Sequence, residues 1–283
     1  MKKKKGNFTT IILILILLVG LSLLLYPSVS DYWNSFHQTR AIESYDKEVS
    51  QLDERQCEKL REDAIAYNKA LLEGGHDYVL NEEEKKKYEQ QLNVSGLGIM
   101  GYIEIPSINC SLPIYHGTND DVLQIAVGHL PWSSLPVGGK STHCVISGHR
   151  GLPSAKLFTN LDKLVEGDLF MLRVLDEVLT YEVDQILIVE PQETEALRIV
   201  NGEDYCTLVT CTPYGINTHR LLVRGHRVEN IDMQAGNVTA DAMQIEPFLV
   251  APVVAIPILL VLLIALLLPR QPKKKGGDAD ENE

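Results

Sequence analysis

The sequence lacks the features of two large classes of protein. Its five cysteines are scattered, odd in number and include no CxxC pair, so they do not form the framework of a disulfide-rich domain. Basic residues are too few for a typical nucleic-acid-binding domain, because 26 lysines and arginines face 38 aspartates and glutamates, for a net charge of −12. The composition therefore argues against a disulfide scaffold and against nucleic acid as a partner, and it leaves at least one thiol unpaired.

Proline and glycine are also absent from residues 31–73. Apolar residues in this segment recur at steps of three and four, as at Ile42, Tyr45 and Val49, which places them on one stripe of a helix. The spacing predicts one long or two shorter amphipathic helices that pack on the chain's own domain. A coiled coil with a second chain is the alternative, which the interruption of the pattern at residues 56–59 disfavours.

An apolar run near the N-terminus predicts a membrane anchor. Residues 8–26 follow a row of lysines and are long enough to cross a membrane, which takes about 20 residues. We expect this run to be retained. Cleavage as a signal peptide at the small residues 28–30 is the alternative.

A second apolar run, residues 248–268, predicts another anchor. Basic residues lie on the outer flank of both runs, and lysine and arginine favour the cytoplasmic side. We therefore expect both ends, residues 1–7 and 269–283, in the cytoplasm and everything between the runs outside the cell. An apolar tail followed by lysines also resembles a cell-wall sorting signal, but residues 241–247 carry no LPxTG-like motif, so an anchor is the better interpretation.

From residue 99 the pattern changes to that of a β protein. Seven segments rich in β-branched and aromatic residues predict strands, at residues 100–105, 111–115, 141–147, 169–175, 178–189, 205–211 and 220–228. Short helices are expected at residues 120–127, 156–164 and 193–199. Many short strands with few helices predict a closed barrel or a sandwich over residues 99–228.

Two connectors complete the predicted organisation. The helical arm, residues 27–73, is followed by a connector at residues 74–98, in which Asn81 is expected to cap a short helix over residues 82–92. A polar linker at residues 229–247 leads back to the second apolar run. The connector either lies over a neighbouring surface or is a solvated link.

Three residues at the ends of predicted strands suggest chemistry. Cys211 ends one β-type run, and Arg220, nine residues later, opens the next. A loop of this length lets the two strands pair, so the thiol and the guanidinium face each other. His149 ends a third run. A thiol that attacks a carbonyl and an imidazole that protonates the leaving amine are the minimal set for acyl transfer, and a permanently charged guanidinium stabilises an oxyanion.

Simpler interpretations compete with this one. A single cysteine is usually a small core residue, and a single histidine usually lies on the surface or caps a helix. Another alternative is a zinc site formed by Cys144, His149, Cys206 and Cys211. Residues five apart on a strand point to opposite faces, so these four side chains do not converge, and Cys206 is expected in the core opposite Cys211.

The motifs around these residues resemble those of the sortase family. They are TLVTCTP at residues 207–213, NTHRLLVRG at residues 217–225 and SGHR at residues 147–150. The combination of TLxTC, an arginine nine residues later and an upstream Gly-His is specific. The resemblance covers about residues 98–228 and implies an eight-stranded barrel with short helices and the catalytic set of His149, Cys211 and Arg220.

Within the family the chain is most similar to class C, the pilin-polymerising sortases. The similar features are SSLPVGG at residues 133–139 with His129 just before it, LFTNL at residues 157–161 and the second apolar run. The resemblance implies cleavage of an LPxTG-like motif after its threonine and transfer of the acyl group from Cys211 to a lysine amine of a pilin or to a wall-precursor amine. His129 and Thr210 are expected to line the substrate groove, and no cofactor or metal is expected.

One departure concerns a lid. Many class C enzymes carry an Asp-Pro-aromatic motif in a lid before the barrel, whereas residues 74–98 contain Asp77 and Tyr78 but no Asp-Pro pair. Proline would stiffen such a lid, so its absence predicts a looser lid, a different one or none. A wall-anchoring sortase, a thiol hydrolase and a non-enzymatic membrane-tethered β-domain remain the alternatives for function.

Overall fold

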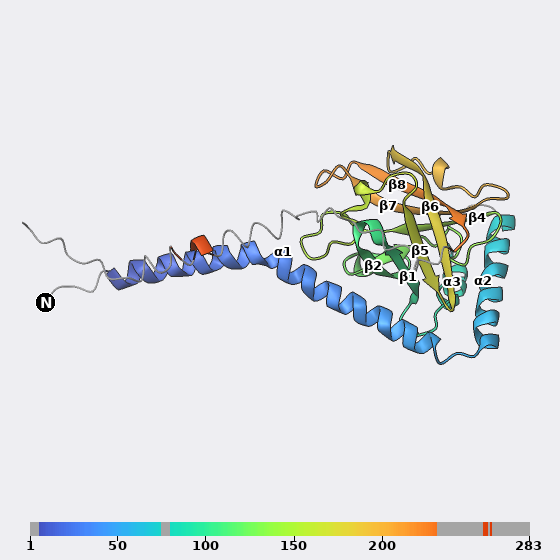
Figure 1. Ribbon diagram of the computed structural model, residues 1–283, viewed down its shortest axis with the longest axis horizontal. Coiled ribbons are helices and arrows are strands. Elements are labelled where there is room, and N and C mark those ends of the chain that lie inside the picture. The colour runs from blue at the N-terminus through green and yellow to red at the C-terminus, as the bar shows by residue number, and fades with distance from the viewer. Residues whose placement is uncertain (1–5, 75–79, 231–256, 260, 262–283) are drawn as a thin grey trace, which may run out of the picture. The chain divides into compact units, whose positions relative to one another are not determined.

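The computed structural model describes residues 6–74, 80–230, 257–259 and 261 (Figure 1). Val29–Thr239 forms a compact unit of its own, which contains the helical arm and the β domain. The expected lid residues, Asp77 and Tyr78, lie outside the described residues, and so does most of the second predicted membrane segment.

The N-terminal helix is longer than either element predicted there. α1 (Gly6–Val49) continues through Pro27, so the apolar run and the first part of the arm are one helix. Within the described residues it is the one helix long and apolar enough to cross a membrane.

The start of the second helix is set by a capping box. α2 (Glu54–Gly74) is preceded by Asp53, whose Oδ1 accepts from Gln56 N at 2.8 Å, while Gln56 Oε1 accepts from Asp53 N at 2.9 Å. This reciprocal capping box starts a new helix and sets the break at residues 50–53. The interruption predicted at residues 56–59 was therefore placed a few residues too late.

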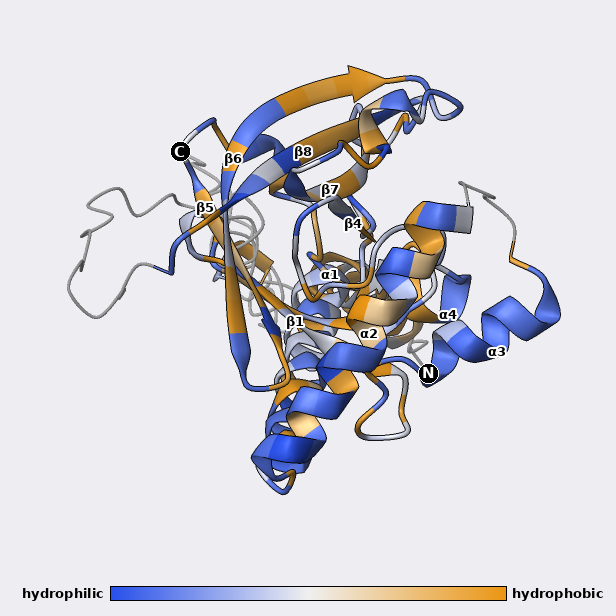
Figure 2. Cartoon of the chain, turned by 90° about the vertical axis from the view of Figure 1, so that its right-hand side faces the viewer, coloured by the Kyte–Doolittle hydropathy of each residue, from blue (hydrophilic) through white to orange (hydrophobic). Residues whose placement is uncertain are grey.

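The third helix confirms the expected cap. α3 (Glu82–Gln90) begins after Asn81, whose side chain accepts from Glu83 N and Glu84 N. Figure 2 shows α3 as largely hydrophilic and α2 as a mixture of hydrophilic and hydrophobic residues. Each helix therefore buries only part of its surface.

Eight strands close into the barrel that the sequence resemblance implied. The strands follow one another around the barrel in the order β1-β2-β3-β4-β7-β8-β6-β5. Their bounds are β1 Ile99–Ile105, β2 Cys110–His116, β3 Val127–His129, β4 Thr142–Ser147, β5 Leu169–Val174, β6 Glu177–Val189, β7 Asp204–Thr212 and β8 His219–Val228. The short helices between them are η1 Pro106–Ile108, α4 Asp120–Leu123, η2 Leu161–Lys163 and η3 Glu195–Leu197.

One strand was not predicted from its residues. β3 is three residues long and contains Gly128, so it offers neither the length nor the alternation on which strand prediction depends. A Cβ at Gly128 would lie 2.0 Å from the Gly117 carbonyl oxygen. The segment therefore pairs only because glycine lets the two backbones approach.

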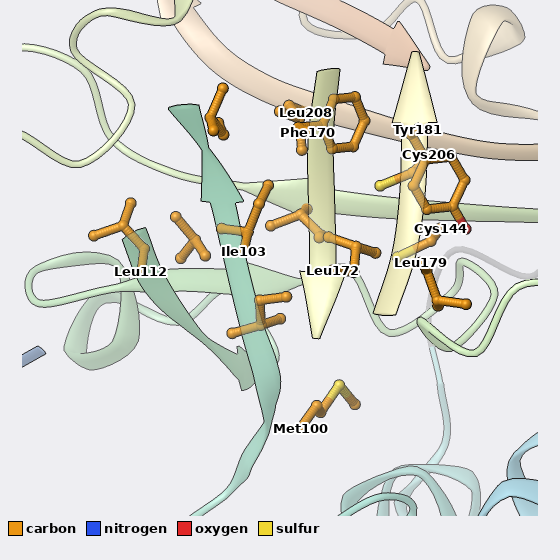
Figure 3. Close-up of a cluster of buried hydrophobic side chains, with 14 of the residues drawn as sticks. Met100, Ile103, Leu112, Cys144, Phe170, Leu172, Leu179, Tyr181, Cys206 and Leu208 are labelled. Carbon is orange, nitrogen blue, oxygen red and sulfur yellow. The ribbon is translucent and has the colours of Figure 1, made fainter. Parts of the chain in front are cut away.

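The barrel interior is filled by side chains. Figure 3 shows part of this cluster, with residues from β1, β5, β6 and β7 converging on one another. Cys144 and Cys206 belong to it, are 2% and 0% exposed, and are directly opposite each other in the parallel β4–β7 pair. Cys206 is thus a core residue, as predicted.

Polar contacts bind the helical arm to the barrel. The Tyr45 hydroxyl of α1 donates to the Met100 carbonyl oxygen at 3.0 Å and accepts from Leu175 N at 2.8 Å. The Asn68 amide of α2 donates to and accepts from the backbone of Leu135. Both side chains are buried, so each satisfies backbone groups that water does not reach.

Candidate active site

Cys211 and Arg220 are direct partners across two antiparallel strands. Cys211 is the residue before the last of β7, and it pairs with Arg220, the second residue of β8. Side chains of directly paired residues lie on the same face, with Cβ atoms about 4.5–5.5 Å apart. The structure thus confirms that the two residues face each other.

His149 follows β4, the strand that pairs with β7 on the side away from β8. The parallel β4–β7 register pairs Ser147 with Val209. Gly148 N continues this pairing with a hydrogen bond of 3.0 Å to the Val209 carbonyl oxygen. β4 ends at Ser147, and its register continued by two residues along each chain places His149 opposite Cys211. We call His149, Cys211 and Arg220 the Cys211 row, in which Cys211 and Arg220 are directly paired and His149 takes its place from the extended β4–β7 register.

The backbone before His149 is packed tightly. A Cβ at Gly148 would lie 2.8 Å from atoms of both Phe158 and Val127. The Thr210 hydroxyl donates to the Gly148 carbonyl oxygen at 2.7 Å. Gly148 and Thr210 thus fix the approach of the two segments that carry His149 and Cys211. Sequence reasoning missed this role of Gly148, although a glycine directly after a β-type run was a visible signal.

Two residues expected in the substrate groove lie below the surface. His129 is 0% exposed, and its ring nitrogens contact the Tyr88 hydroxyl at 3.0 Å and the Ser134 carbonyl oxygen at 2.8 Å. Thr210 is 1% exposed and is occupied by its bond to Gly148. The structure corrects both expectations, because the interior positions of β3 and β7 hold these side chains within the barrel wall.

Three of the five thiols, those of Cys57, Cys144 and Cys206, are buried. Burial raises the pKa of Cys110 to about 12 and raises that of Cys206 as well, so both stay protonated and unreactive. Cys211, like Cys110, is partly exposed. Of these two partly exposed thiols, Cys211 is the one that is directly paired with an arginine, Arg220.

The positive charge of Arg220 is not neutralised locally. Its Nη1 donates to the carbonyl oxygens of Asn217 and His219, at 3.2 and 3.1 Å. Within the part of the chain that the structure describes, Arg220 makes no salt bridge, whereas Arg150 and Arg224 each pair with an aspartate. A guanidinium held by carbonyl groups and unpaired is suited to an incoming oxyanion.

No metal centre is visible at this row. Among the described residues there is no group of three or more histidine, cysteine, aspartate or glutamate side chains that could hold a metal ion. The arrangement instead has the parts of an acyl-transfer site, namely a thiol, a histidine and an anion-binding arginine.

Comparison with known proteins identifies the family of this barrel. The model of the sortase domain matches residues 103–228. Sortase C1 from Streptococcus agalactiae is similar in structure, with a TM-score of 0.66 and 53% sequence identity over 68% of this chain and 100% of that chain. The chain belongs to the sortase family, whose members are cysteine transpeptidases, and its structural neighbours include class C sortases.

Two further relatives extend the comparison. A Clostridium perfringens sortase C with its C-terminal cell wall sorting motif has a TM-score of 0.60 and 44% identity, over 68% of this chain and 100% of that chain. Sortase D of Bacillus subtilis is 33% identical over 131 residues, which are 45% of this chain and 63% of that protein. The similarity to these relatives includes the barrel that carries the Cys211 row.

Proposed function

We propose that this chain is a membrane-anchored class C sortase that joins pilin subunits, with Cys211 as nucleophile. The observation that carries the proposal is the direct pairing of Cys211 with Arg220, and the hydrogen bond from Gly148 N to the Val209 carbonyl oxygen, which holds the segment before His149 beside β7, supports it. A structurally similar sortase C from Streptococcus pneumoniae, which has pilin substrate specificity, supports the pilin substrate. The cell wall sorting motif in the structure of the Clostridium perfringens relative supports an LPxTG-like donor.

The geometry supports a two-step acyl transfer. The Cys211 sulfur attacks the carbonyl carbon of the motif's threonine, and the carbonyl oxygen becomes an oxyanion beside Arg220. Collapse of this intermediate forms a thioester and breaks the peptide bond, while His149 gives its proton to the leaving amine of glycine.

A lysine amine resolves the thioester in the second step. It attacks the same carbonyl carbon, His149 takes its proton, and the Cys211 sulfur leaves as the new isopeptide bond forms. The products are a joined pair of polypeptides and the free enzyme. The acceptor belongs to a pilin subunit in this proposal, whereas an amine of a cell-wall precursor would make the chain a wall-anchoring sortase.

The proposed location follows from α1. Residues 8–26 cross the membrane, residues 248–268 form a second anchor, and both termini remain in the cytoplasm. The barrel then lies outside the cell, where pilins and wall precursors are found. Asp77 and Tyr78 are retained as proposed lid residues.

The test is capture of the acyl-enzyme. The full chain in detergent is incubated with an LPxTG peptide and examined by intact-mass and peptide mass spectrometry. We expect a thioester adduct on Cys211, absent from Cys211→Ala, that Nα-acetyl-lysine amide converts to an isopeptide product faster than water releases it. Absence of the adduct would remove the enzymatic proposal, and release by water alone would favour a thiol hydrolase.

A further inference from the structure

Arg150 follows His149 directly and is held by several groups at once. Its side chain is only 10% exposed. Nη1 donates to Thr212 Oγ1 at 3.3 Å, Nη2 pairs with Asp162, and the guanidinium carbon lies 5.9 Å from the centre of the Tyr214 ring. A buried guanidinium with so many contacts is fixed in place and does not extend into solvent.

One of these contacts reaches the residue next to the nucleophile. Thr212 follows Cys211 in β7 and is 8% exposed. The bond from Arg150 to Thr212 therefore joins the backbone just after His149 to the backbone just after Cys211. The two bonded residues are 62 positions apart in the sequence.

A second link lies on the other side of the same pair. The hydroxyl of Thr210, the residue before Cys211, donates to the carbonyl oxygen of Gly148, the residue before His149, at 2.7 Å. The thiol and the imidazole are thus enclosed by one cross-link before them and one after them. The first uses a backbone acceptor, whereas the second consists entirely of side chains.

The other contacts of Arg150 hold its segment against the following loop. Asp162 belongs to η2 and its side chain is 43% exposed. An ion pair to such an exposed carboxylate contributes little to stability, so its main effect is to hold the Arg150 side chain in place. Gly151 N donates to Thr159 Oγ1 at 3.1 Å and ties the same turn to residues near η2. The Nε of Arg150 is buried without a hydrogen-bond partner among the described residues, which costs desolvation free energy. The contacts of Nη1 with Thr212 and of Nη2 with Asp162 must offset this cost.

We propose that Arg150 is a positioning residue for the transfer reaction, acting through Thr212 to keep the His149 imidazole in line with the Cys211 thiol. This inference rests on the proposed roles of His149 and Cys211. Arg150 touches neither the substrate nor the reacting atoms in this scheme. Proton transfer between the imidazole, the thiol and the leaving amine depends on their separation, and a misplacement of about 1 Å can lower the rate about 100-fold.

The test changes each partner of the link in the full chain. Arg150→Lys keeps the charge but loses the fork, and Thr212→Val keeps the shape but loses the hydroxyl. We expect each to lower kcat of peptide transfer about tenfold or more, with KM within about twofold, because alignment is lost and binding is kept. The double variant should be no slower than the slower single variant, since both changes break one contact.

Two further variants separate positioning from general stability. Thr212→Ser restores the hydroxyl and should recover kcat to within about twofold of the unmodified chain. Arg224→Lys is the matched control, because Arg224 also pairs with an aspartate, Asp184, and lies 4.2 Å from the ring centre of Tyr205, but away from the Cys211 row. It should leave kcat unchanged, although it removes a bidentate contact with a carboxylate.

Several results would overturn the inference. Among them are an unchanged kcat in Arg150→Lys and Thr212→Val, losses that simply add in the double variant, and an equal loss in Arg224→Lys. If the unmodified chain forms no thioester, the proposed function fails, and the rate at which iodoacetamide alkylates Cys211 becomes the readout. A rate changed by Thr212→Val and restored by Thr212→Ser would still support the positioning role, and a rate equal in all variants would refute it.

Discussion

Cys211 and Arg220 are directly paired residues of β7 and β8, so the barrel register itself sets the distance between thiol and guanidinium. Neither side chain depends on a long loop for its place. A shift of the register by one residue would replace Arg220 with Leu221, which is 4% exposed and belongs to the core. The hydrophobic pattern of β8 therefore protects the alignment of the site.

This pairing predicts that lysine cannot replace Arg220. Arg220→Lys keeps the charge but loses the planar fork that Asn217 and His219 hold with their carbonyl oxygens. We expect kcat/KM for an LPxTG peptide to fall about 100-fold, the effect of losing one oxyanion donor. The melting temperature of the chain should stay within about 2 °C, because the residue is partly exposed and makes no ion pair among the described residues. A loss below about threefold would show that Arg220 is not an oxyanion donor.

The tight packing at Gly148 leads to a second prediction. In Gly148→Ala the new methyl group would lie 2.8 Å from Phe158 and Val127, so the segment that carries His149 has to move outward. Such overpacking costs about 1–3 kcal/mol of stability. Activity should fall by a larger factor than stability explains, because His149 moves away from Cys211.

The control for this prediction is Gly74→Ala at the end of α2, where nothing lies within 4 Å of the added carbon. Gly74→Ala should change neither the free energy of unfolding nor the peptide-transfer activity measurably. Urea unfolding and peptide-transfer assays on both variants provide the measurement. Full activity in Gly148→Ala would mean that the packing before His149 does not position the imidazole.

The arm should contribute to stability without contributing to chemistry. Tyr45→Phe removes the hydroxyl that bridges Met100 and Leu175, and it leaves the buried N–H of Leu175 without its partner. We expect a loss of about 1–2 kcal/mol in the free energy of unfolding and unchanged kcat. Tyr102→Phe is the comparison, because its hydroxyl meets Asp46 at 3.3 Å in an exposed position, and it should cost no more than about 0.5 kcal/mol. Equal losses in the two variants would contradict the bridging role of Tyr45.

Features that depend on residues close together in the sequence could be predicted from it, whereas features that depend on contacts between distant segments could not. Seven strands follow from the β-branched and aromatic residues within each segment, and the nine-residue spacing of Cys211 and Arg220 is enough to expect their pairing. β3 was missed because Gly128 and a length of three residues leave no pattern. The capping box of Asp53 and Gln56 has a sequence signature that marks the start of α2, whereas the apolar spacing alone indicates a later break.

Contacts between distant side chains carry no such signal. Nothing in the order of residues indicates that Arg150 bonds to Thr212 or that the buried Thr210 hydroxyl bonds to Gly148. These bonds exist because β4 and β7 are parallel neighbours, and a parallel pair brings together segments that are far apart in sequence. The resemblance to sortases predicted the catalytic set, whose roles stay a prediction until the acyl-enzyme is measured.

The partly buried carboxylate of Asp204 leads to a prediction about the pH dependence of stability. It accepts hydrogen bonds from Gly139 N at 2.8 Å and from the Tyr181 hydroxyl at 3.0 Å. Burial nevertheless raises the pKa of Asp204 above its ordinary value of 3.8, because removal from water disfavours the charge more than these bonds favour it. The folded chain therefore binds this proton more tightly than the unfolded chain does.

The direction in which stability changes with pH follows from this difference in proton binding between the folded and the unfolded chain. A carboxyl with a raised pKa stabilises the fold fully below pH 3.8, and this contribution is lost as the pH rises through the raised pKa. Asparagine at position 204 does not titrate in Asp204→Asn. The free energy of unfolding of the unmodified chain minus that of Asp204→Asn therefore isolates the contribution of the Asp204 titration. We expect this difference to fall steadily as the pH rises from 3.8, as measured by urea unfolding at several values up to pH 7. A difference that grows with pH would mean that the hydrogen bonds from Gly139 and Tyr181 outweigh burial, and that Asp204 stabilises the start of β7 in its charged form.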